Sequence, residues 1–134
     1  MQFLKRYFAS LYIAIGWTLI LLVLLTLPGN MLPNEAAFRI PNLDKWVHCG
    51  LFGGFVFLWG LYASVKKFST RKNLRIYFAL FITASLLGIT TEYIQKYFIP
   101  FRDFELGDII ADLIGAGIAY GVCNLTLVEE KDSQ

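Results

Sequence analysis

Residues 7–27 read YFASLYIAIGWTLILLVLLTL and contain no charged side chain. A helix needs about 20 mainly apolar residues to cross the roughly 30 Å hydrocarbon core of a bilayer. Lys5 and Arg6 precede the run, as in a signal peptide, but the run is longer than the usual apolar region of about 7–15 residues and no A-x-A site follows it. We therefore expect a retained transmembrane helix that ends before Pro28-Gly29.

Three further stretches have the length and composition of membrane-spanning helices, at about 44–65, 74–98 and 107–127. Hydrophobic residues make up 57% of the 134 residues and charged residues only 16%, against about 45–50% and 25% in soluble domains. An open sheet at membrane depth would leave backbone groups unpaired in lipid. We predict an all-α integral membrane bundle of four transmembrane helices over residues 1–127, with a polar C-terminal tail at 128–134.

The basic residues predict the orientation of this bundle. The strongest group lies between the second and third helices: Lys66, Lys67, Arg71, Lys72 and Arg75. Lys5 and Arg6 lie before the first helix, and cytoplasmic loops carry an excess of Lys and Arg. Both termini are therefore expected in the cytoplasm, and the links 28–43 and 99–106 outside. A net charge of +2 is too small to indicate nucleic-acid binding.

This topology gathers the remaining polar residues at the outer end of the bundle. Eight of them form the candidate polar cluster: Asp44, Lys45, His48, Glu92, Gln95, Arg102, Asp108 and Asp112. Residues three or four apart share a helix face, as Asp108 and Asp112 do. Carboxylates below the membrane interface are costly, so Glu92 and Asp112 need partners. We expect those partners among His48, Lys45 and Arg102.

Each of these residues also has a purely structural interpretation. Asp44 and Asp108 are placed to cap the second and fourth helices. His48 is placed to bond Asp44 one turn away, and Glu92 to pair with Lys96. The functional interpretations make His48 a proton carrier or metal ligand and place Glu92 and Asp112 in a site.

Small residues predict where helices approach closely. Gly50-x-x-x-Gly54 lies on the second helix and Gly117-x-x-x-Gly121 on the fourth. In lipid, this spacing lets two backbones come together. Gly115 and Ala119 continue the Asp108–Asp112 face, so we expect this face to point into the bundle.

The order of these motifs resembles the VanZ-like family of membrane proteins, whose namesake is associated with resistance to the glycopeptide antibiotic teicoplanin. The residues that carry the resemblance are Asp44-Lys45-x-x-His48, Glu92-x-x-Gln95, Arg102 and Asp108-x-x-x-Asp112-x-x-Gly115. The family often has asparagine in place of Asp112. The resemblance covers almost the whole chain and implies a multi-pass protein of the bacterial plasma (inner) membrane that acts in the cell envelope.

Three functions are compatible with the pattern. The first is a protein that binds a lipid or lipid-linked envelope precursor at the outer leaflet, with a phosphate contacted by Arg102, Lys45 and a protonated His48. The second is a membrane enzyme acting on a lipid phosphate, in which carboxylates and His48 hold a divalent cation. The third, a transporter or channel, ranks last because no broken helix or inverted repeat is visible.

The partners expected from this reasoning are membrane lipids and a lipid-linked envelope precursor, and the oligomeric state is left open. We expect no resident cofactor for the binding protein, since a single histidine argues against a zinc site of the usual His/Cys type. The enzyme alternative requires a divalent cation, and oxygen-rich ligation favours magnesium or calcium over zinc.

Overall fold

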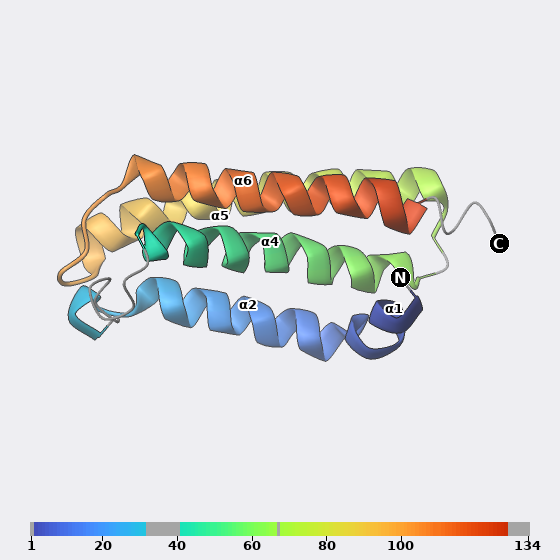
Figure 1. Ribbon diagram of the computed structural model, residues 1–134, viewed down its shortest axis with the longest axis horizontal. Coiled ribbons are helices and arrows are strands. Elements are labelled where there is room, and N and C mark those ends of the chain that lie inside the picture. Colours follow the sequence, from blue (N-terminus) through green and yellow to red (C-terminus); the bar gives the residue numbers. More distant parts are fainter. Residues whose placement is uncertain (1, 32–40, 67, 129–134) are drawn as a thin grey trace.

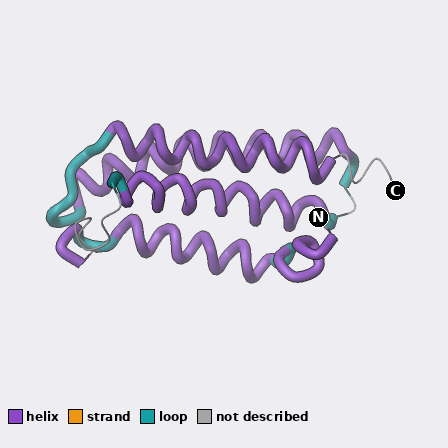
Figure 2. The backbone as a smooth tube through the Cα atoms, viewed as in Figure 1, coloured by secondary structure: helices purple, strands orange, loops and turns teal. Residues whose placement is uncertain are grey.

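The computed structural model describes residues 2–31, 41–66 and 68–128, and every regular element in these ranges is helical. Four long helices run side by side (Figure 1): α2 (Leu11–Thr26), α4 (Leu43–Ser64), α5 (Thr70–Phe98) and α6 (Leu106–Val122). The short elements are α1 (Gln2–Phe8), η1 (Gly29–Met31) and η2 (Cys123–Val128), a π-helix that continues α6. Figure 2 shows the loops confined to the ends of the bundle. The all-α prediction is confirmed, and residues 129–134 of the predicted tail lie outside the described residues.

Three helical stretches are long and apolar enough to cross a membrane: α4, α5 and the continuous segment Leu106–Leu127. A fourth is present if α1 and α2 are taken as one bent span. The exposed surface is apolar, since Leu86 and Ile118 are each 61% exposed, whereas Glu92 and Asp112 are at most 1% exposed. Apolar residues outside and carboxylates inside are what a lipid solvent selects. The chain therefore has three or four helices that could span a membrane.

The prediction of one continuous helix over residues 7–27 is wrong at its start. α1 and α2 are bent by 75° at a break after Phe8, and Ser10 has the extended backbone of an N-cap residue. The Ser10 hydroxyl makes no capping hydrogen bond to the first turn of α2, so the cap does not explain the break. The turn lets Leu4 and Ala9 pack against the buried cluster around Tyr77. Burial at the bundle end therefore favours the bend over a straight helix.

The other predicted boundaries differ by a turn or less, except at the end of α6. α4 starts and ends one residue earlier than the predicted 44–65. α5 starts four residues before the predicted 74–98, because the hydroxyl of Ser69 accepts a hydrogen bond from the backbone N–H of Lys72. The predicted 107–127 begins at Leu106 and changes to π-helical geometry at Cys123.

The closest helix contact joins α4 and α6, but not through the predicted glycine motifs. A Cβ at Gly115 would collide with the backbone carbonyl of Cys49, and one at Gly53 would lie 3.1 Å from the carbonyl oxygen of Gly115. Gly50 and Gly121, by contrast, face open space. Small residues do let the backbones meet, as expected in lipid, but at Gly53 and Gly115, one and two residues from the predicted motifs. Gly54 of the predicted motif packs against the Trp17 ring of α2 instead.

Indole groups fix α2 against α4. Trp17 Nε1 donates to the backbone oxygen of Leu51 at 2.9 Å, and Trp59 Nε1 donates to Thr18 Oγ1 at 3.0 Å. α2 is apolar on all sides, so its hydrophobic pattern does not select a face. These two directional bonds supply the selection, because a buried indole N–H without an acceptor is costly.

Candidate functional site

The polar cluster assembles where four helix ends meet. The C-terminal ends of α2 and α5 and the N-terminal ends of α4 and α6 share one end of the bundle, at the left of Figure 1. The link after α2 contacts the link after α5: the backbone N–H of Gly29 donates a hydrogen bond to the carbonyl oxygen of Pro100 at 3.1 Å. A Cβ at Gly29 would overlap the carbonyl of Phe101, so glycine is required for this approach. Six of the eight residues of the candidate polar cluster take part in one contact network at this end; the exceptions are Arg102 and Gln95, whose side chain bonds the backbone of Leu25 instead.

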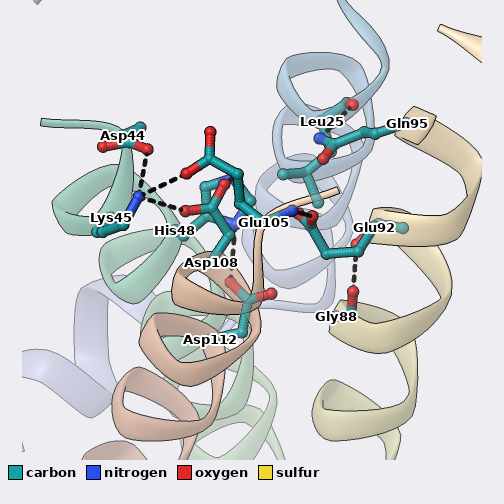
Figure 3. A network of polar contacts seen from close by, with 11 residues as sticks. Leu25, Asp44, Lys45, His48, Gly88, Glu92, Gln95, Glu105, Asp108 and Asp112 are labelled. Atoms are coloured by element: carbon teal, nitrogen blue, oxygen red, sulfur yellow. Dashed lines mark hydrogen bonds and ion pairs between the residues drawn. The ribbon is translucent and has the colours of Figure 1, made fainter. Parts of the chain in front are cut away.

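Lys45 is the cationic centre of the outer part of the network (Figure 3). Its Nζ lies 2.8 Å from Asp44 Oδ2, 2.9 Å from Glu105 Oε2 and 3.2 Å from Asp108 Oδ1. The Lys45 side chain is 31% exposed, so it forms the solvent-facing rim. One ammonium thus faces three carboxylates, and the local charge is negative.

The predicted cap of α4 by Asp44 is wrong. Asn42 is the N-cap and has left-handed backbone angles, with φ 53°. Asparagine adopts this conformation more readily than most residues. Asp44 lies in the first turn of α4, where its negative charge interacts favourably with the positive end of the helix dipole. Its carboxylate also pairs with Lys45. Asp108 likewise lies in the first turn of α6, whose N-cap is Glu105.

His48 is held between two carboxylates of α6. The residue is 3% exposed; its Nδ1 lies 3.0 Å from Asp112 Oδ1, and its Nε2 lies 3.6 Å from Asp108 Oδ2. The first distance is a hydrogen bond and the second is too long for one. The alternative that His48 bonds Asp44 is therefore not the arrangement found. The expected partnership of Asp112 with His48 is confirmed.

Glu92 is fully buried and reaches across the bundle. Its Oε2 accepts a hydrogen bond from the backbone N–H of Glu105 at 2.8 Å, while its Oε1 has no hydrogen-bond partner among the described residues. The predicted alternative, a local pair with Lys96, is not observed. Lys96 lies one turn after Glu92 but is exposed, with its Nζ 5.4 Å from the ring centroid of Tyr97.

Gln95 lies at the same end of the bundle but makes a separate, structural contact. Its Nε2 donates to the backbone oxygen of Leu25 at 2.9 Å, and its side chain is almost fully buried. The last carbonyls of a helix lack intrahelical partners. Gln95 therefore satisfies the C-terminal end of α2 and ties it to α5.

Arg102 does not partner the buried carboxylates as predicted. It lies in the link between α5 and α6, directly after Phe101, which has a left-handed backbone with φ 59°. This conformation is unfavourable for an aromatic residue and marks a constrained link. The Nε atom of Arg102 is buried and has no hydrogen-bond partner among the described residues.

Sequence reasoning missed three polar residues: the half-exposed Glu105, which belongs to the network, and the buried Asn73 and Tyr77. Glu105 joins the two parts of the network through its carboxylate and its backbone N–H. Its position three residues before Asp108 was the available signal. At the opposite end of the bundle, the side chains of Asn73 and Tyr77 are buried, and neither has a hydrogen-bond partner for its polar atoms within the described ranges.

Two groups of side chains have the spacing of metal ligands. One ligand atom each from His48, Glu92 and Asp108 lies within 4.8 Å of the other two, and all three residues are buried. Asp44, Glu105 and Asp108 form the second group, around the Lys45 ammonium. This arrangement can hold a cation or a proton. The sequence has one histidine, so the site is not of the usual zinc type.

The network as a whole is strongly acidic. It holds five carboxylates from three helices and one link: Asp44, Glu92, Glu105, Asp108 and Asp112. Lys45 is the one permanent cation among its described members. No family model, no curated protein and no solved structure matches this sequence.

Proposed function

We propose that the chain is a VanZ-like multi-pass protein of a bacterial plasma membrane whose polar end binds the phosphate of a lipid or lipid-linked envelope precursor at the outer leaflet. The opposite end carries basic residues on and beside the link between α4 and α5: Lys66, Arg71, Lys72 and Arg75. Basic loops favour the cytoplasm, which supports the outward orientation of the candidate polar cluster and a cytoplasmic location of both termini.

Arg102 carries the phosphate proposal. Its Nε atom is buried without an acceptor, and leaving a charged donor unsatisfied costs more than about 1–3 kcal/mol. A phosphate oxygen at headgroup depth supplies the acceptor, and guanidinium groups bind phosphates in a two-pronged geometry. Lys45 fits a direct phosphate contact less well than the sequence predicted, because three carboxylates already surround its Nζ.

Native mass spectrometry of the purified protein in detergent tests this proposal. Wild type should retain an anionic phospholipid or lipid-linked phosphate, and Arg102→Ala should lose it. Arg71→Ala, which removes a guanidinium from the opposite end, is the matched control and should retain it. Equal retention by the two variants, or no retained phosphate lipid in wild type, contradicts the proposal.

The same lipid chemistry gives the proposal a cellular readout. A protein that shields an envelope precursor should change the susceptibility of its host to teicoplanin when it is overproduced. The Arg102→Ala protein, produced at the same level, should not cause this change. Unchanged susceptibility with wild type would restrict the proposal to lipid binding without an effect on glycopeptides.

A second candidate, an enzyme that hydrolyses or transfers a lipid phosphate, is favoured by one observation. His48, Glu92 and Asp108 have the spacing of cation ligands, and a bound cation would polarise a phosphate oxygen or activate water. Purified protein should then release phosphate from a polyprenyl or phosphatidyl phosphate only when a divalent cation is added. Glu92→Gln should abolish that release; binding without turnover favours the first candidate.

A further inference from the structure

We propose that His48, Glu92 and Asp108 bind one divalent cation of the Mn²⁺ or Zn²⁺ type, with Asp112 as the residue that orients His48. The three ligands come from three different helices, α4, α5 and α6, and meet inside the bundle (Figure 3). Binding of the cation rests on this geometry alone, whereas its contact with a lipid phosphate rests on the proposed function.

The distances between the ligand atoms suit a shared cation. Nitrogen and oxygen ligands lie about 2.0–2.2 Å from such ions, so two adjacent ligands are about 3–3.6 Å apart and opposite ones about 4.2 Å. His48 Nε2 lies 3.6 Å from Asp108 Oδ2, too far for a hydrogen bond and near the spacing of two adjacent ligands. All three ligand atoms lie within 4.8 Å of one another, so a small contraction closes the site.

The buried carboxylate of Glu92 lacks a full set of partners, which indicates that a cation binds beside it. The residue is 0% exposed, one of its oxygens belongs to the His48–Asp108 group, and its Oε1 accepts no hydrogen bond within the described ranges. A buried carboxylate without full compensation is among the costliest groups in a protein. A cation between Glu92, His48 and Asp108 supplies that compensation.

Asp112 gives His48 the orientation of a metal ligand. Histidines that bind metals almost always donate the other ring N–H to a carboxylate, carbonyl or water. The Nδ1 of His48 lies 3.0 Å from Asp112 Oδ1, and an ionised carboxylate can only accept this bond. The neutral ring then carries its lone pair on Nε2, the atom that faces Asp108.

Lys45 neutralises part of the charge of the outer group, Asp44, Glu105 and Asp108, whereas the inner group of His48, Glu92 and Asp108 contains no cationic side chain of its own. The Lys45 ammonium lies between Asp44, Glu105 and Asp108, and so acts as the cation of the outer acidic group. It uses Oδ1 of Asp108, while Oδ2 of the same carboxylate faces His48. Asp108 thus bridges a filled outer position and an inner position whose charge is balanced by a bound cation.

The donor set selects the class of ion. This choice differs from the Mg²⁺ or Ca²⁺ favoured by the sequence, because the three grouped ligands include an imidazole nitrogen. One imidazole nitrogen with two carboxylate oxygens suits Mn²⁺ or Zn²⁺ better than Ca²⁺, which prefers six to eight oxygens, or Mg²⁺, which rarely leaves water for nitrogen. Three protein ligands also leave coordination positions open. An oxygen of a bound phosphate can occupy one of them, which would let an acidic site hold an anionic headgroup.

Binding of Mn²⁺ to the full-length protein tests the proposal. The protein is purified in lipid-free detergent with a tag that contains no histidine, stripped with EDTA and titrated with Mn²⁺ while free Mn²⁺ is measured by electron paramagnetic resonance. Wild type should bind one Mn²⁺ per chain, and Zn²⁺ should displace it. His48→Gln and Glu92→Gln should remove a ligand and weaken binding at least tenfold. Asp112→Asn should weaken it about 10–100-fold, as changes behind a metal ligand do.

Asp103→Asn is the matched control, because Asp103 is an exposed acid in the link between α5 and α6, at the same end of the bundle. Circular dichroism and gel filtration establish whether each variant folds. If a ligand variant does not fold, the Mn²⁺ affinity of Asp112→Asn tests the inference in its place. Absence of a bound ion in wild type overturns the inference, as do ligand variants that bind like Asp103→Asn. Retention of a phosphate lipid by the stripped protein would leave the proposed function standing without the cation.

Discussion

Gly115→Ala should separate α4 from α6 and disturb the polar network one turn away. The ideal Cβ would lie 2.8 Å from the carbonyl carbon of Cys49, whereas carbon atoms in contact are about 3.5–4.0 Å apart. Backbone atoms cannot rotate away, so the helices must move apart by about 1 Å. Overpacking of this kind costs about 1–3 kcal/mol.

The displacement reaches the site because His48 precedes Cys49 and Asp112 lies one turn before Gly115. Their hydrogen bond of 3.0 Å would lengthen to about 4 Å, beyond the limit for a hydrogen bond. We therefore expect Gly115→Ala to lower both the free energy of unfolding and the affinity for Mn²⁺. Equilibrium unfolding in SDS, followed by circular dichroism, measures the first quantity, and the Mn²⁺ titration measures the second.

Gly121→Ala is the control for Gly115→Ala, since it makes the same change on the same helix where nothing lies within 4 Å. Alanine favours a helix over glycine by about 0.5–1 kcal/mol, so this variant should be as stable as wild type or slightly more stable. If the two variants have equal free energies of unfolding, the close contact between α4 and α6 at Gly115 is refuted.

Three further changes probe separate parts of the structure. Gln95→Leu leaves the carbonyl of Leu25 without its donor and should lower the free energy of unfolding in SDS by about 1 kcal/mol; an unchanged stability would mean that Gln95 does not tie α2 to α5. Trp17→Phe removes the donor to the Leu51 carbonyl and should cost a similar amount, with equal stability contradicting the α2–α4 bond. Lys45→Met empties the outer acidic group, so Mn²⁺ binding should rise from one to two ions per chain. A stoichiometry that stays at one, in a folded variant, would mean that Lys45 does not act as the cation of that group.

Helical periodicity predicted the parts of the site that lie within helices. Asp108, Asp112, Gly115 and Ala119 were expected on one inward face, and all four are buried. The same reasoning placed Glu92 near the end of α5, where it is buried. These residues follow the repeat of the α-helix, which fixes a face without knowledge of the neighbouring helices.

The contacts between elements could not be predicted in the same way. Pairing of Lys45 with Glu105 and of Glu92 with the Glu105 backbone depends on the path of the link after α5, which no repeat describes. The choice of Gly53 and Gly115 over Gly50 and Gly121 depends on how far α4 and α6 slide past each other. The bend before Ser10 contains no proline or glycine and follows from packing at the bundle end.

Electron spin echo measurements on the Mn²⁺-loaded protein give the most direct test of a cation held at the centre of the bundle. The sequence contains one histidine, so any modulation from a directly bound imidazole ¹⁴N must come from His48 when the tag contains none. We predict the coupling of one such nitrogen in wild type and its loss in His48→Gln. A Mn²⁺ signal without nitrogen coupling, or identical spectra for the two proteins, would contradict the assignment of His48 as a ligand.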